Sequence, residues 1–136
     1  MFLPALVPEK PYSADDKLGS VLVVEDDPQV LTIAAETVRL LGYEVYTASN
    51  STEALTVLNR GIPIEILFTD IVMPNGLNGI ALAREARQLH PNIRVLLTSG
   101  YARDRTPADT DMPFIAKPYQ LPELARLLEA IRSGRT

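Results

Sequence analysis

The fold is decided by residues 64–79, which read Ile64-Glu65-Ile66-Leu67-Phe68-Thr69-Asp70-Ile71-Val72-Met73-Pro74-Asn75-Gly76-Leu77-Asn78-Gly79. The first part is a mostly apolar run that is too short for a helix, and Pro74, Gly76 and Gly79 prevent its continuation beyond Met73. We therefore predict a buried strand that delivers Asp70 to a loop. Ligands of open parallel sheets bind at the carboxyl ends of the strands, so Asp70 is a candidate binding residue. Taken alone, it could equally cap the loop.

The remaining sequence alternates between strand and helix patterns. Further strands are predicted at 21–24, 44–48, 94–98 and 114–116, and helices at 28–41, 51–60, 79–89 and 121–132. Short alternating elements indicate an α/β fold, a doubly wound five-stranded parallel sheet flanked by helices on both faces. Residues 99–113 contain Gly100, Pro107 and Pro113 with little apolar periodicity, so a full helix is not expected there.

The size of the chain fits one domain. With 136 residues and 46% hydrophobic residues, we expect a single folded unit over 19–136, preceded by an extension or linker at 1–18 that contains three prolines. The apolar start, Met1 to Pro8, lacks a basic leader and is interrupted by prolines, so it is a poor secretory signal. No apolar run approaches the roughly 18 residues of a membrane span, and no membrane association is expected.

Charge and cysteine content exclude several classes of function. A net charge of −4 without a Lys/Arg cluster argues against direct nucleic-acid binding. The absence of Cys and the single histidine, His90, argue against a histidine-based zinc site and fit a cytoplasmic location. There is no glycine-rich phosphate loop of the G-x-G-x-x-G or Walker type, which argues against a nucleotide site.

Polar residues stand at the ends of four predicted strands: Glu25, Asp26 and Asp27 after the first, Asp70, Thr98, and Lys117. Carboxylates about 4 Å apart repel by roughly 4 kcal/mol per pair at an effective dielectric near 20, so such a cluster favours a bound cation. Oxygen ligands without Cys or His indicate Mg²⁺. The alternative for the acidic run is a solvated helix N-terminus, where negative charge is favourable.

These residue types also suit phosphoryl transfer. A carboxylate beside a divalent cation can attack phosphorus, which makes Asp70 the candidate nucleophile. Lys117 and the Thr98 hydroxyl would stabilise the phosphoryl oxygens. Read singly, Thr98 is an ordinary strand residue and Lys117 an ordinary surface cation, and only their combination points to a site.

The sequence resembles the receiver (response-regulator) domains of bacterial two-component signalling over residues 20–132. The resemblance rests on four segments in order, Val21-Leu22-Val23-Val24-Glu25-Asp26-Asp27-Pro28, Thr69-Asp70-Ile71-Val72-Met73-Pro74, Thr98-Ser99-Gly100-Tyr101 and Lys117-Pro118-Tyr119. It implies a flavodoxin-like fold with strand order 2-1-3-4-5, like that of the chemotaxis regulators. It also implies a protein that catalyses only its own phosphorylation and dephosphorylation.

The resemblance assigns roles to individual residues. Asp70 would accept a phosphoryl group from a sensor histidine kinase or a histidine phosphotransfer protein. Mg²⁺ would be held by Asp26, by Asp70, by the Val72 main-chain carbonyl, and by Glu25 through water. Thr98 and Lys117 would bind the phosphoryl group, Phe114 would be the switch aromatic, and a cis peptide would precede Pro118. Asp27 is expected to cap the first helix instead.

Two departures from the common pattern affect the expected output. The loop Asn75-Gly76-Leu77-Asn78 is one residue longer than in most receivers, which resembles receivers joined to sensor kinases and some stand-alone receivers. The stretch from Thr98 to Phe114 is short, and it resembles receivers with a Ser-Gly-Tyr sequence that lack an ordered fourth helix. We therefore expect that helix to be short or disordered, with phosphorylation biasing residues 99–113.

Other functions remain alternatives. The chain could be a stand-alone regulator or a receiver module from a hybrid histidine kinase. The downstream protein target is unknown, and a homodimer is left open. A phosphatase of the haloacid-dehalogenase type would need a second Asp two residues after Asp70, where this chain has Val72. A receiver that serves only as an interaction module is a third alternative.

Overall fold

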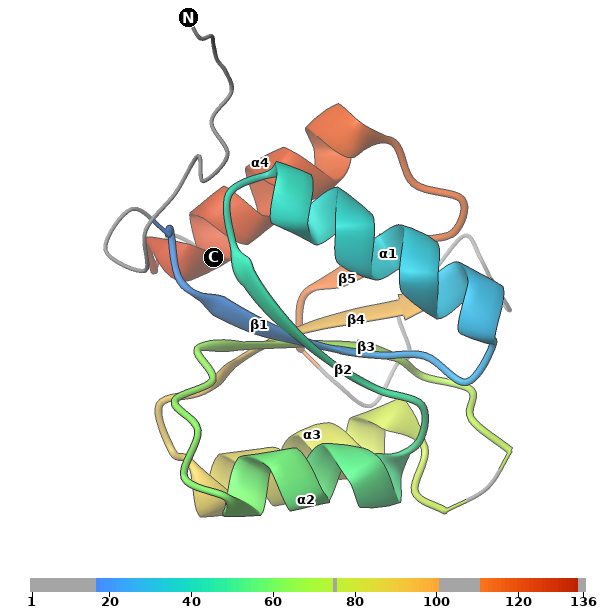
Figure 1. The fold of residues 1–136 in the computed structure, drawn as a ribbon, viewed down its shortest axis with the longest axis vertical. Helices are drawn as coiled ribbons and strands as arrows, with labels where there is room; N and C mark the ends of the chain where they lie inside the picture. The colour runs from blue at the N-terminus through green and yellow to red at the C-terminus, as the bar shows by residue number, and fades with distance from the viewer. Residues whose placement is uncertain (1–16, 75, 101–110, 135–136) are drawn as a thin grey trace, which may run out of the picture.

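The structure is a computed structural model that describes residues 17–74, 76–100 and 111–134. Within these ranges, five parallel strands form one sheet in the order β2-β1-β3-β4-β5 (Figure 1). The strands are β1 Ser20–Val24, β2 Glu44–Ala48, β3 Ile66–Asp70, β4 Arg94–Ser99 and β5 Phe114–Ala116. The helices are α1 Pro28–Leu40, α2 Ser51–Asn59, α3 Gly79–Leu89 and α4 Leu121–Arg132. The predicted doubly wound fold and its strand order are confirmed.

Helices cover both faces of the sheet. Helices α1 and α4 lie on one face, and α2 and α3 lie on the other (Figure 1). Along β1, Leu22 and Val24 pack towards α2 and α3, whereas Val21 and Val23 pack towards α1 and α4. Every residue of β1 and β3 is buried. This is why the central strands read as continuous apolar runs and not as alternating ones.

The helix starts follow from local side chains. Asp27 accepts hydrogen bonds from the main-chain N–H groups of Gln29 and Val30, so it caps α1 as predicted. Asn50 caps α2 by accepting a bond from the Glu53 N–H at 2.8 Å. The reciprocal bond of the capping box is shifted by one residue, because the Glu53 carboxylate accepts from Ser49 and not from Asn50.

Two predicted segments lie mainly outside the described residues. In these segments, the residues outside the description are 1–16 of the predicted extension and 101–110 of the predicted irregular segment. Next to these segments, the Leu18 N–H donates to the Gly42 carbonyl at 2.9 Å, and Met112 is buried in the core. The domain boundary near residue 19 and the expected short fourth helix remain predictions. None of the helices described is long and apolar enough to cross a membrane.

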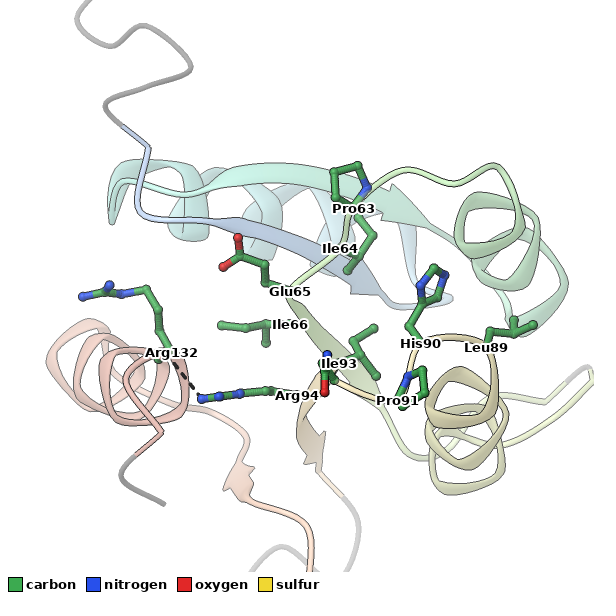
Figure 2. A pocket seen from close by; sticks show the side chains of 11 residues that line it. Pro63, Ile64, Glu65, Ile66, Leu89, His90, Pro91, Ile93, Arg94 and Arg132 are labelled. Atoms are coloured by element: carbon green, nitrogen blue, oxygen red, sulfur yellow. Dashed lines mark hydrogen bonds between the residues drawn. The ribbon is translucent and has the colours of Figure 1, made fainter.

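The amino ends of β3 and β4 border a pocket of about 440 Å³, drawn in Figure 2. Its wall is held by polar contacts to helix ends. Arg94 donates from Nη1 to the Ile131 carbonyl at the end of α4, and the His90 ring bonds the Leu58 carbonyl at 2.8 Å. The acidic residues identified in the sequence stand at the opposite edge of the sheet, where the strands end.

Candidate functional site

Three carboxylates meet at the carboxyl edge of the sheet. Glu25 and Asp26 follow β1, Asp70 is the last residue of β3, and β1 and β3 are neighbours. One oxygen from each of the three carboxylates lies within 4.8 Å of the others. Glu25 and Asp70 are only 5% and 6% exposed, whereas Asp26 is open to solvent. The structure therefore brings together the acidic residues that the sequence singled out.

Lys117 completes this cluster, and it directly follows β5, the strand at one edge of the sheet. Its Nζ donates to Glu25 Oε1 at 2.7 Å and to Asp70 Oδ2 at 3.4 Å. The Lys117 main-chain N–H donates to the Ser99 carbonyl at 3.1 Å, which fixes the backbone after β5. The Lys117–Pro118 peptide bond is cis. A lysine 47 residues from Asp70 in sequence is thus placed against it by the parallel strands.

Thr98 lies beside Asp70 with its hydroxyl unused. The two residues are register partners on β4 and β3, and the Thr98 carbonyl accepts the Ile71 N–H at 2.9 Å. The Thr98 side-chain oxygen is buried, and it has no hydrogen-bond partner in the described part of the chain. An orphaned buried hydroxyl costs free energy unless a ligand supplies its partner.

Val72 and Phe114 border the cluster in different ways. The Val72 N–H hydrogen-bonds the Asp70 carboxylate, and the Val72 side chain is 42% exposed. Phe114 is half-buried opposite Leu97 of β4, and it packs against the core beneath α2 and α3. The roles predicted for the Val72 carbonyl and for the Phe114 ring stay predictions.

Burial and charge shift the proton affinities at the site. Burial raises the pKa of Glu25 and of Asp70, although Lys117 acts to lower both values. Burial acts to lower the pKa of Lys117, but its hydrogen bond to Glu25 and the negative charge of Asp70 outweigh that effect and raise it. Keeping Glu25 and Asp70 ionised in the folded protein therefore costs free energy, and the Lys117 ammonium offsets this cost only in part.

This arrangement can accept a hard divalent cation. The cluster offers carboxylate oxygens and contains no histidine or cysteine, which suits Mg²⁺ better than zinc. Burial, and to a smaller extent the negative charge of Asp26, raise the pKa of Asp70, and a bound cation would act against both effects. The donor set therefore fits the metal predicted from the sequence.

Gly79 is a structural requirement of the site that the sequence analysis did not recognise. A Cβ at Gly79 would lie 2.1 Å from the Asp70 carbonyl oxygen and 2.8 Å from the Ile71 Cα. Only glycine lets the first turn of α3 approach β3 this closely. In the sequence, Gly79 was identified only as a residue that stops the preceding strand. The close approach depends on how α3 packs, so sequence alone gives no signal for it.

Tyr119 is a second such residue: it belongs to the segment Lys117-Pro118-Tyr119, but the sequence assigned it no role of its own. Its ring packs on Phe68 at 5.8 Å between centroids, and burial raises the pKa of its hydroxyl. Its position two residues after Lys117 was the available signal.

Comparisons with known proteins agree with this geometry. The family model of the response regulator receiver domain matches residues 21–129. The chain is 34% identical over 145 residues to the sensor kinase CckA of Brucella abortus (strain 2308), covering 92% of this chain but 15% of that protein. It is 31% identical over 113 residues to the receiver protein CpdR of the same strain, covering 80% of this chain and 92% of CpdR.

Solved structures of receiver proteins superpose on this chain. The receiver domain of the hybrid histidine kinase CckA superposes with a TM-score of 0.72 at 32% identity, covering 84% of this chain and 99% of that one. TrrA of Thermotoga maritima, solved in complex with Mg(2+)-BeF, superposes with a TM-score of 0.73 at 28% identity, covering 83% and 98%. With its acidic pocket of Glu25, Asp26 and Asp70 at the edge of a 2-1-3-4-5 sheet, this chain belongs to the response regulator receiver domain family.

Proposed function

We propose that this receiver domain accepts a phosphoryl group on Asp70 from a phosphohistidine of a sensor histidine kinase or a histidine phosphotransfer protein. The observation that carries the proposal is the buried Asp70 carboxylate, flanked by the Lys117 ammonium and by the Thr98 hydroxyl, which has no hydrogen-bond partner among the residues that the structure describes. A nucleophile, a cation and a free donor are the groups that phosphoryl transfer requires.

The reaction is a displacement at phosphorus. An Asp70 carboxylate oxygen forms a bond to phosphorus while the bond between phosphorus and the histidine nitrogen breaks, and the imidazole leaves with the electron pair. Lys117 holds positive charge beside the transferring group, and Thr98 donates its hydroxyl hydrogen to a phosphoryl oxygen. Hydrolysis of the acyl phosphate returns Asp70 to the carboxylate.

Mg²⁺ is the proposed cofactor. Asp26 and Asp70 would hold it directly, Glu25 through water, and Val72 through its main-chain carbonyl. When bound, Mg²⁺ neutralises charge on the phosphoryl oxygens. The structure of TrrA, to which this chain is 28% identical, was solved in complex with Mg(2+)-BeF.

The output is a shift between conformations. Phosphorylation adds nearly two negative charges at Asp70, which would draw Thr98 and Lys117 towards the phosphoryl group and change the packing of Phe114. Reversing a 1:99 equilibrium takes about 5.5 kcal/mol, so binding of a downstream protein would complete the shift. Residues 99–113 are the segment whose hydrogen exchange should respond.

The phosphodonor is expected to approach along α1. A groove of about 610 Å³ runs between α1 and the start of α4, and Lys117 lines it together with Ile33, Leu40 and Tyr119. Ile33 and Leu40 are 66% and 80% exposed. Because Lys117 belongs to both the groove and the acidic cluster, a protein docked on this apolar surface would present its phosphohistidine beside Asp70. We place this encounter in the cytoplasm.

Intact mass spectrometry tests the proposed function. Incubation with acetyl phosphate and Mg²⁺ should add one phosphoryl group to the wild-type chain and none to Asp70→Ala. Turnover of external phosphoesters would instead support an aspartyl-nucleophile phosphatase, and no modification would support a pure interaction module. Whether the chain works alone or as part of a hybrid kinase is settled by the size of the protein detected in cells.

A further inference from the structure

The loop between β3 and α3 is tied to the start of a different helix. Ser51 is the first residue of α2, and its side-chain oxygen accepts the Leu77 N–H at 2.9 Å across 26 residues of sequence. Ser51 is only 2% exposed. Gly76 approaches the same oxygen so closely that a Cβ there would lie 2.5 Å from it. The loop is therefore fitted against one hydroxyl.

Helix α2 does not need this hydroxyl for its own end. Asn50 caps α2 through the Glu53 N–H, and Ser49 bonds the Glu53 carboxylate. Asn50 thus serves the Glu53 N–H, and the Asn50 carbonyl accepts the Ala54 N–H at 3.0 Å. The Ser51 oxygen is left to serve the loop.

The bond between Ser51 and Leu77 joins the two loops that lie on either side of Asp26. In the sheet, β2 and β3 flank β1, so the loops that follow β2 and β3 meet above the end of β1. They enclose a pocket of about 210 Å³ lined by Asp26, Ser49, Asn50, Met73 and Pro74. One wall of this pocket comes from each loop, and Asp26 lies between them.

The other end of the loop is fixed at the sheet. The Gly79 N–H donates to the Ile71 carbonyl at 2.8 Å, and the Ile71 N–H donates to the Thr98 carbonyl at 2.9 Å. The described residues of this loop, 72–74 and 76–78, are therefore attached to β4 and α3 at the base of the loop and to Ser51 at Leu77. The orientation of the Val72 peptide depends on both attachments.

We propose that Ser51 is a positioning residue that holds this loop over the acidic cluster and thereby sets the affinity of the site for Mg²⁺. The inference rests on the proposed function, because it takes the Val72 main-chain carbonyl as a metal ligand. Residues that orient metal ligands typically contribute 10- to 100-fold in metal affinity. Removing the Ser51 hydroxyl is expected to weaken Mg²⁺ binding about tenfold.

The test is a titration with Mg²⁺ alone, followed through the amide shifts of Asp26 and Val72 in the full chain. Ser51→Ala should weaken binding about tenfold, whereas Thr52→Ala, an exposed hydroxyl one residue later, should leave it unchanged. Urea unfolding of the same variants without metal separates a change in the loop from a change in global stability.

Gly76→Ala tests the contact between Ser51 and the loop from the loop side. It should weaken Mg²⁺ binding in the wild-type background, and it should cost less in the Ser51→Ala background, where the oxygen it collides with is gone. Wild-type affinity in both single variants, additive losses, or no Mg²⁺ binding by the wild-type chain would each overturn the inference. If acetyl phosphate still labels Asp70 while Ser51→Ala binds Mg²⁺ normally, only this inference fails and the proposed function stands.

Discussion

Two buried threonines at the ends of neighbouring strands have opposite hydrogen-bonding states. Thr69 donates its hydroxyl to the Asp70 carbonyl at 2.9 Å, whereas the Thr98 hydroxyl has no partner among the described residues. Both are nearly inaccessible to solvent. The Thr69 hydroxyl is thus bonded within the fold, whereas the proposed function assigns the Thr98 hydroxyl to the phosphoryl group.

Replacing each threonine by valine should therefore affect the free energy of unfolding differently. Thr69→Val is expected to lower the free energy of unfolding by about 1–2 kcal/mol, because it removes a buried hydrogen bond. Thr98→Val should leave that free energy unchanged or raise it by about 1 kcal/mol, because it removes an unsatisfied polar group. Urea titration gives both values. A loss on Thr98→Val as large as that on Thr69→Val would show that the Thr98 hydroxyl is already bonded in solution.

The raised pKa of Asp70 leads to a second prediction at the residue scale. Since the folded state carries this carboxylate at a cost, Asp70→Asn should raise the free energy of unfolding by roughly 1 kcal/mol in Mg²⁺-free buffer. Asp27→Asn is the matched control, because it removes a nearby charge while asparagine still caps α1. Equal stabilisation of the two variants would mean that net charge, and not the cluster, is responsible.

At the scale of elements, the contact between β3 and the first turn of α3 leaves no room for a side chain. Alanine normally stabilises a helix relative to glycine by about 1 kcal/mol. Gly79→Ala should instead destabilise the protein by about 1–3 kcal/mol, because its Cβ would overlap the Asp70 carbonyl. Chemical unfolding should be compared with Gly61→Ala, which places a Cβ in open space at φ +78° and carries only the backbone strain. A Gly79→Ala protein as stable as wild type would contradict this reading of the contact.

The apolar face of α1 gives a prediction about the phosphodonor. Ile33→Lys should slow phosphoryl transfer from a phosphorylated histidine kinase at least tenfold while leaving the reaction with acetyl phosphate unchanged, because only a protein donor needs the groove. Leu89→Lys, which changes an exposed leucine on α3 at the opposite face, is the control. Equal rates for Ile33→Lys and wild type with the kinase would place the docking surface elsewhere.

For the whole molecule, the site links stability to pH and to Mg²⁺. The pKa of Glu25 and that of Asp70 are raised by burial, so in Mg²⁺-free buffer the folded state holds these protons more tightly than the unfolded chain. Stability should therefore increase as the pH falls through the raised values, and this gain should be complete near the ordinary carboxyl pKa of about 4. The contribution of Lys117, whose pKa is also raised, is present below its ordinary value and is lost at high pH.

Added Mg²⁺ should reverse this dependence. The cation binds only ionised carboxylates, so its stabilisation should be largest at neutral pH and should vanish as Glu25 and Asp70 become protonated. Thermal unfolding between about pH 4 and pH 8, with and without Mg²⁺, measures both effects. A Mg²⁺ stabilisation that is independent of pH would place the ion outside this cluster.

The sequence by itself determined the fold and the identity of the cluster. Buried parallel strands must be apolar on both faces, and Val21-Leu22-Val23-Val24 and Ile66-Leu67-Phe68 show this directly, so the central strands and Asp70 could be located without coordinates. The strand order followed from the resemblance to receiver domains. The strand ends of an α/β sheet share one edge, which brought Asp26, Asp70 and Lys117 into a single hypothesis.

Only the tertiary structure decided the contacts that hold the cluster in shape. Three features depend on how elements distant in sequence pack, to within a few tenths of an ångström. They are the lack of a partner for the Thr98 hydroxyl within the described ranges, the lack of room for a Cβ at Gly79, and the bond from Leu77 to Ser51. Periodicity reports which face of an element is buried, but it carries no information on the separation between two packed backbones. That separation determines which hydroxyl is bonded, which is left free, and where glycine is required.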